Sequence, residues 1–141
     1  MPVFPSVEWF EDLKGRVNGT ERFKHFGTID CVMGVQVDDQ IFQIVFEAFE
    51  VTEVSEPSAE DKPDMDFTLT MSAADWREML ENISEHGKAD LHHTLNSIDL
   101  EKEEEFAKGD DYTRRDLFYR FNQTLQDFFD ASAKLDTTFP D

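Results

Sequence analysis

The stretch from Thr113 to Leu135 constrains the fold more than any other part of the sequence. Its apolar residues recur three and four positions apart, with Ser132 in the one gap, at Phe118, Phe121, Leu125, Phe128 and Leu135. Positions with this spacing share one face of an α-helix, so the stretch predicts an amphipathic helix with an aromatic seam. Gly and Pro are both missing from it, and Thr113 with Asp116 fits a capping box at its start. A helix with this much Phe needs a large apolar partner.

Two other periodicities divide the chain upstream of this helix. Alternation of apolar and polar residues predicts strands over 29–37, 41–49 and 67–71, the first two joined as a hairpin by Asp38-Asp39-Gln40. Val51 and Val54 indicate either that the second strand continues past a bend or that another short strand follows. Helical spacing predicts helices over 7–18, about 20–26, 73–86 and 91–98. The remaining pieces are an acidic loop over 55–66 and a weak strand from 101 into a turn at Gly109.

Capping residues support two of these helices. Ser6 can cap the first helix, which Asn18-Gly19 closes. Ser72 with Asp75 forms a capping box for the helix that Gly87 ends. Because strands come early and helices lie at both ends, we predict an α+β fold, an antiparallel or mixed sheet with helices on one face. The 141 residues predict a single domain with a loose tail from about 136.

Charge and composition exclude several classes of function. A formal net charge of −19 repels phosphate backbones and anionic lipid surfaces, so we expect no nucleic-acid partner and no stable membrane insertion. Cys31 is the only cysteine, which excludes an internal disulfide and a thiolate metal cluster and favours a cytoplasmic location. The first ten residues lack the pattern of a signal peptide. The 14 Phe residues suit a dense core or the wall of an apolar cavity.

Catalytic and metal-binding motifs are missing from the sequence. The histidines His25, His86, His92 and His93 show no metal-ligand spacing, and the carboxylates of 99–105 lack the pattern of a calcium loop. We therefore predict no metal, no cofactor and no catalytic set. Polar residues that border the seam are of more interest, namely Arg115, Tyr119, Asn122 and Gln126. Such groups either satisfy buried backbone atoms or meet the polar end of an apolar ligand, and the sequence leaves both interpretations open.

Two short strings resemble a known family. The strand–helix unit DFTLTMSAADWREML (66–80) and the string KGDD (108–111), together with the order of elements, are similar to sterol carrier protein 2-like (SCP2-like) lipid-binding domains. The resemblance implies a sheet of about five strands covered by helices, with an apolar tunnel between them. It also implies binding of fatty acids, acyl chains or sterols without metal or covalent chemistry.

Our leading hypothesis is therefore non-catalytic binding or transport of an apolar ligand between sheet and helices. The predicted ligand-binding residues are Phe42, Phe46, Phe67, Leu69, Trp76, Leu80, Arg115, Phe118, Tyr119, Phe121, Asn122 and Leu125. One alternative is an enzyme or enzyme accessory protein for a hydrophobic small molecule, with His92 or His93 and Arg115 as its polar groups. Another is a protein-interaction module, including a homodimer, in which the seam pairs with a second chain.

Overall fold

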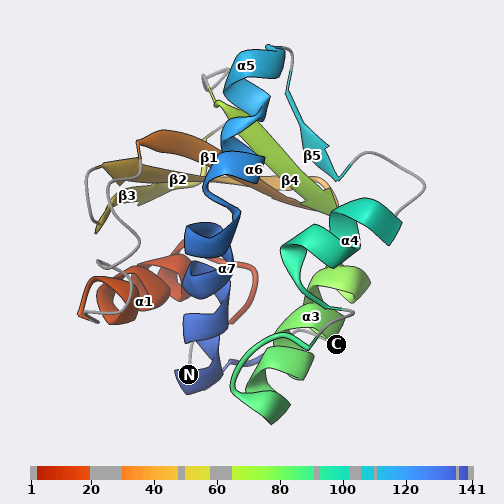
Figure 1. Cartoon of the computed structure of the whole chain (residues 1–141). Helices are drawn as coiled ribbons and strands as arrows, with labels where there is room; N and C mark the ends of the chain where they lie inside the picture. Colours follow the sequence, from red (N-terminus) through yellow and green to blue (C-terminus); the bar gives the residue numbers. More distant parts are fainter. Residues whose placement is uncertain are drawn as a thin grey trace.

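A computed structural model describes residues 3–19, 30–47, 50–57, 65–90, 93–101, 106–109, 111–135 and 137–139. It confirms the predicted α+β class, with a five-stranded mixed sheet and a helical C-terminal region (Figure 1). The predicted helix over 20–26, with His25, lies outside the described residues, as do His92 and most of the predicted acidic loop.

The sheet has the strand order β3-β2-β1-β4-β5. Its strands are β1 (Cys31–Val37), β2 (Gln40–Glu47), β3 (Glu50–Ser55), β4 (Phe67–Met71) and β5 (Ala107–Lys108). β1 and β4 are parallel and the other pairs are antiparallel. The predicted hairpin is confirmed, with Asp38 in the left-handed region at a φ of 53°. A separate β3, whose register on β2 shifts between Val45 and Phe46, settles the alternative that the sequence leaves open.

The helices that cover the sheet are α1 (Val7–Asn18), α3 (Ala73–His86), α4 (Leu95–Glu101) and α7 (Asn122–Asp130). In Figure 1, α1, α3 and α7 lie on the same side of the sheet. The predicted caps of α1 and α3 are confirmed. Ser6 Oγ accepts from Trp9 N at 3.1 Å, Ser72 Oγ accepts from Asp75 N at 3.2 Å, and Gly87 ends α3 at a φ of 81°.

The prediction of one continuous helix from Thr113 to Leu135 is wrong. The structure divides this run into α5 (Tyr112–Arg115), α6 (Leu117–Arg120), α7 and a 3-10 turn, η1 (Ala131–Lys134), with breaks at Asp116 and Phe121. The cap also differs, because Asp111 Oδ1 accepts from the backbone N–H groups of Thr113 and Arg114. The spacing of the apolar residues identifies the buried face of a helix, but it does not show where the helix axis changes direction. Phe118 packs on Phe67 of β4, whereas Phe128 packs on Phe46 of β2, so the run has to follow a twisted sheet.

The C-terminal tail is not loose over 137–139. Val3 and Thr138 form a parallel bridge, and Phe4 N donates to Thr138 O at 2.9 Å. Trp9 Nε1 donates to Thr137 Oγ1 at 2.9 Å, which ties the tail to α1. The backbone bridge and the buried Trp9 indole thus hold residues 137–139 in place. The sequence of this segment has no periodicity from which these contacts could be predicted.

Candidate functional site

The structure brings the apolar members of the predicted site together in one interior between sheet and helices. They are buried to a relative exposure of 3% or less, namely Phe42, Phe46, Phe67, Leu69, Trp76, Leu80, Phe118 and Leu125. Phe121 is partly buried and packs against the same cluster. Leu80 also lines a surface pocket of about 320 Å³ beside α3.

Aromatic rings fill this interior. Phe118 of α6 contacts Phe67 at 5.8 Å and Phe106 at 6.0 Å between ring centroids. Trp76 of α3 contacts Phe106 at 6.1 Å and Phe129 at 5.5 Å. The indole N–H of Trp76 is satisfied, since Nε1 donates to Gln36 O at 2.9 Å. The rings therefore form a continuous aromatic layer from β4 through α6 to α3.

Phe106 and Phe129 are members of this layer that the sequence pattern does not single out. Phe106 ends an acidic run, EKEEEF, in which charge hides its role, and it directly precedes β5. Phe129 flanks the seam rather than lying in it, and it is nevertheless fully buried. The size of the side chain is the one feature of the sequence that predicts burial of Phe106 and Phe129, because a Phe ring has a large apolar surface.

Of the polar residues of the predicted site, Arg115 and Asn122 adjoin the two breaks that delimit α6, and Tyr119 lies within α6. Tyr119 is 47% exposed, and its hydroxyl donates to Asp99 Oδ2 at 2.9 Å, which links α6 to α4. Partial burial, together with that hydrogen bond, raises the pKa of the Tyr119 phenol. The Arg115 guanidinium lies over the Tyr112 ring, 4.7 Å from its centroid. The Tyr119 ring also contacts the Phe118 ring of the aromatic layer, with 5.0 Å between the centroids.

Asn122 differs from these neighbours in one respect. Its side-chain Nδ2 is buried and has no hydrogen-bond partner among the described residues. Asn122 begins α7 directly after the break at Phe121, whose ring lies partly buried against the core. A buried N–H group without an acceptor costs roughly 1–3 kcal/mol, so this amide is a natural place for a ligand oxygen.

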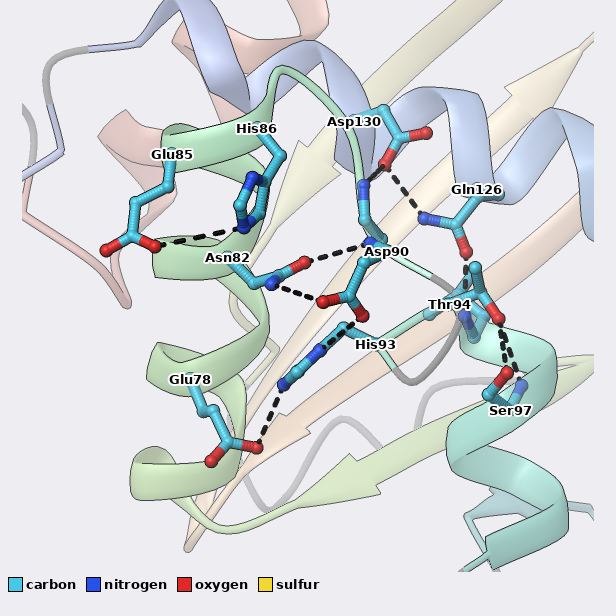
Figure 2. Close-up of polar contacts among 12 residues, drawn as sticks. Glu78, Asn82, Glu85, His86, Asp90, His93, Thr94, Ser97, Gln126 and Asp130 are labelled. Carbon is cyan, nitrogen blue, oxygen red and sulfur yellow. Dashed lines mark hydrogen bonds and ion pairs between the residues drawn. The ribbon is translucent and has the colours of Figure 1, made fainter.

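Gln126 has a structural role, which decides between its two interpretations. Its Oε1 accepts from Leu95 N at 2.7 Å, and its Nε2 donates to Asp130 Oδ1 at 2.9 Å (Figure 2). Asp130 Oδ1 also accepts from Ala89 N at 3.1 Å. Gln126 is only 7% exposed, and its amide satisfies the backbone N–H of Leu95 at the start of α4, while Asp130 satisfies that of Ala89 between α3 and α4.

The described pocket that His93 lines does not include Arg115. His93 Nδ1 lies 2.7 Å from Asp90 Oδ1, and His93 Nε2 lies 3.4 Å from Glu78 Oε2 (Figure 2). The hydrogen bond with Asp90 raises the pKa of His93. The pocket that His93 lines, of about 390 Å³, is formed otherwise by α3 residues, namely Ala74, Arg77, Glu78, Glu81, Asn82 and Glu85. His86 lies at the exposed end of α3, with Nε2 3.9 Å from Glu85 Oε2.

The two strings that carry the family resemblance meet in space. β4 pairs with β5 through Thr68 and Lys108, and a side chain at Gly109 would approach Asp66 O to 3.0 Å. Asp66 Oδ1 forms an ion pair with Arg114 Nε at 2.7 Å, and Asp66 Oδ2 accepts from Val32 N at 2.7 Å. The carboxylate thus joins β1, β4 and the start of the C-terminal helical region.

Neither metal chemistry nor thiol chemistry is indicated by the described residues. Burial raises the pKa of the Cys31 thiol, and the nearby Asp66 and Asp30 carboxylates raise it further, which keeps the sulfur protonated. Across the described ranges, His, Cys, Asp and Glu side chains do not gather in groups of three that could hold a metal ion.

The apolar seam faces inward. Phe118, Leu125 and Phe128 are fully buried in the core of their own chain. A homodimer through the C-terminal helical region would have to use its other face, and it stays a prediction.

Comparison with protein-family models, with curated proteins and with solved structures finds no match to this chain. The helices of the described part of the chain include none with the length and apolar character needed to cross a bilayer.

Proposed function

We propose that this protein binds an apolar ligand with one polar end, such as a fatty acid, an acyl chain or a sterol-like molecule, between its sheet and its helices. The observation that carries the proposal is the buried, unpaired Nδ2 of Asn122, the residue after Phe121, which packs against the core. An oxygen of the ligand's polar end would accept from this amide, and the apolar body would lie against the Phe and Trp rings.

Ligand entry requires α6 to move. The ring of Phe118 occupies the space between Phe67 and Phe106, so an acyl chain has to displace it. Phe121, with a φ of −104° and a ψ of 17°, is the point at which the backbone can swing, because it departs from helical geometry, whereas Asp116 keeps helical angles. Burying ligand surface at roughly 25 cal/mol per Å² offsets the contacts that are lost.

The resemblance to SCP2-like domains gives independent support. Its two strings lie far apart in the sequence, yet Asp66 and Gly109 are neighbours at the β4–β5 edge. The helical region that follows Gly109 also supplies Phe118 to the interior. This support concerns the class of ligand, not its identity.

Lipid extraction and native mass spectrometry of the purified protein test the proposal, followed by titration with a fluorescent fatty acid. Replacing Asn122 with alanine should weaken fatty-acid binding about fivefold, the effect of losing one hydrogen bond of about 1 kcal/mol. Gln123→Ala is the matched control, because Gln123 is the exposed neighbour on the same helix. Protein that carries no lipid and binds no fatty acid would refute the function. Equal binding by both variants would refute the role of Asn122.

A further inference from the structure

A second, separate pocket lies between α3, η1 and the C-terminal segment. Its volume is about 320 Å³, and its lining residues are Leu80, Glu81, Ser84, Glu85, Ser132, Leu135, Thr137 and Phe139. It is distinct from the aromatic layer, because the Phe and Trp rings of that layer do not line it. A pocket of this volume is at the lower end of the range for small-molecule sites.

Ser132 is the unusual member of this lining. It occupies the one gap in the apolar seam, and it is only 4% exposed. Its Oγ is buried and has no hydrogen-bond partner among the described residues. A buried hydroxyl in this state is unfavourable unless something else completes its hydrogen bonding. Ser132 lines the pocket, so a ligand there would lie next to the residue whose hydroxyl lacks a partner.

The apolar lining residues define the shape of a ligand's body. Leu80, Leu135 and Phe139 supply apolar walls. The Phe139 ring is held in place by the Phe4 ring, 6.1 Å away between centroids, and by the Arg77 guanidinium, 5.0 Å from the Phe139 centroid. A ligand body that contacts these walls has to be apolar and compact.

Charge decides the nature of the polar group. Glu81 and Glu85 line the pocket, whereas its described lining includes neither Lys nor Arg. Arg77 Nε lies 3.3 Å from Glu81 Oε1 and neutralises that carboxylate only in part, since both side chains are about half exposed. Because Glu81 and Glu85 line this pocket, an anionic ligand is repelled from it and a cationic one is attracted.

We propose that this pocket binds a small primary amine with an apolar body. The ammonium group donates to Ser132 Oγ in the field of Glu81 and Glu85, and the body packs against Leu80, Leu135 and Phe139. The site shares Leu80 with the predicted acyl-chain site but uses a different polar residue, Ser132 in place of Asn122, so either proposal can be refuted alone.

Three probes of nearly the same shape test the charge preference, namely benzylamine, benzyl alcohol and benzoate. Titration followed by methyl NMR should show benzylamine shifting Leu80 and Leu135, while Leu95 and Leu125 stay unchanged. Benzyl alcohol should bind about tenfold more weakly and benzoate more weakly still. Benzoate binding as tightly as benzylamine, or shifts at Leu125 instead, would overturn the proposal.

Variants separate a binding role of Ser132 from a packing role. Ser132→Ala should weaken benzylamine binding about fivefold while raising the melting temperature, because it removes an unsatisfied buried hydroxyl. The double variant Glu81→Gln/Glu85→Gln should weaken benzylamine binding about tenfold and narrow the gap to benzyl alcohol. Glu53→Gln, an exposed change on β3, is the charge control and should bind as the wild type does. A Ser132→Ala protein that is more stable but binds benzylamine unchanged would show that the hydroxyl serves packing alone.

Discussion

At the scale of single residues, His93 is held between carboxylates from two segments, Asp90 three positions before it and Glu78 on α3. These contacts raise the pKa of His93 above its unfolded value of about 6.5. The protonated form is therefore favoured by folding. Its stabilisation is complete below about pH 6.5 and is lost as pH rises through the folded pKa. His93→Gln should remove this pH-dependent loss of folding stability, which is roughly 0.5 kcal/mol for a partly exposed pair.

Urea unfolding of both proteins from pH 5.5 to pH 8.5 measures the effect. The wild type should lose stability relative to His93→Gln across this interval. His86→Ala leaves the His93 cluster intact and should keep the wild-type slope. Parallel pH profiles for wild type and His93→Gln would contradict the assignment.

Residue chemistry in the sequence predicts local structure better than it predicts sites. Ser6, Ser72 and Gly87 have short-range roles that depend on neighbours within four positions, and all three are confirmed. The unpaired atoms of Asn122 and Ser132 depend on which distant side chains fail to reach them. The spacing of residues in the sequence does not show which distant side chains reach Asn122 and Ser132. It predicts only that both residues lie in or beside the seam.

At the scale of elements, two glycines give opposite expectations. Gly15 lies inside α1, where an added methyl group would meet no described atom within 4 Å, so Gly15→Ala should stabilise the protein by about 1 kcal/mol through helix propensity. Gly109 follows β5, where a methyl group would come within 3.0 Å of Asp66 O and 3.2 Å of Arg115 Cβ. Gly109→Ala should cost about 1–3 kcal/mol, because backbone has to shift. Chemical denaturation of the pair measures both, and equal effects would contradict the close packing at the β4–β5 edge.

The same edge shows why element boundaries are only partly predictable. Strands with strict alternation, such as β1 and β4, are found where the pattern predicts them. β5 has two residues, Ala107 and Lys108, and owes its existence to pairing with Leu69 and Thr68. The breaks at Asp116 and Phe121 likewise arise from contacts with different strands. Local propensity identifies the helical region, and tertiary contacts divide it.

At the scale of the whole molecule, the net charge of −19 is a source of self-repulsion. Described cations include several that pair with carboxylates one helical turn away, as in Lys14–Glu11 at 3.7 Å and Arg16–Asp12 at 3.9 Å. Such exposed pairs contribute little. Screening should therefore strengthen folding more than it weakens these pairs, and the melting temperature at pH 7 should rise between about 0.05 M and 1 M NaCl.

The rise in melting temperature with NaCl comes from screening of ionised carboxylates, so its size should depend on pH. A pH of 4 is close to the reference pKa values of Asp and Glu in peptides, about 3.9 and 4.3, so roughly half the negative charge is gone. The rise in melting temperature with NaCl should therefore be smaller at pH 4 than at pH 7. Equal concentrations of sucrose, which is uncharged, control for effects on water and should not reproduce the pH difference. A melting temperature that is independent of NaCl at pH 7 would mean that the surface charge is already balanced locally. Folding stability would then depend on the aromatic layer and the helix caps, and not on the net charge.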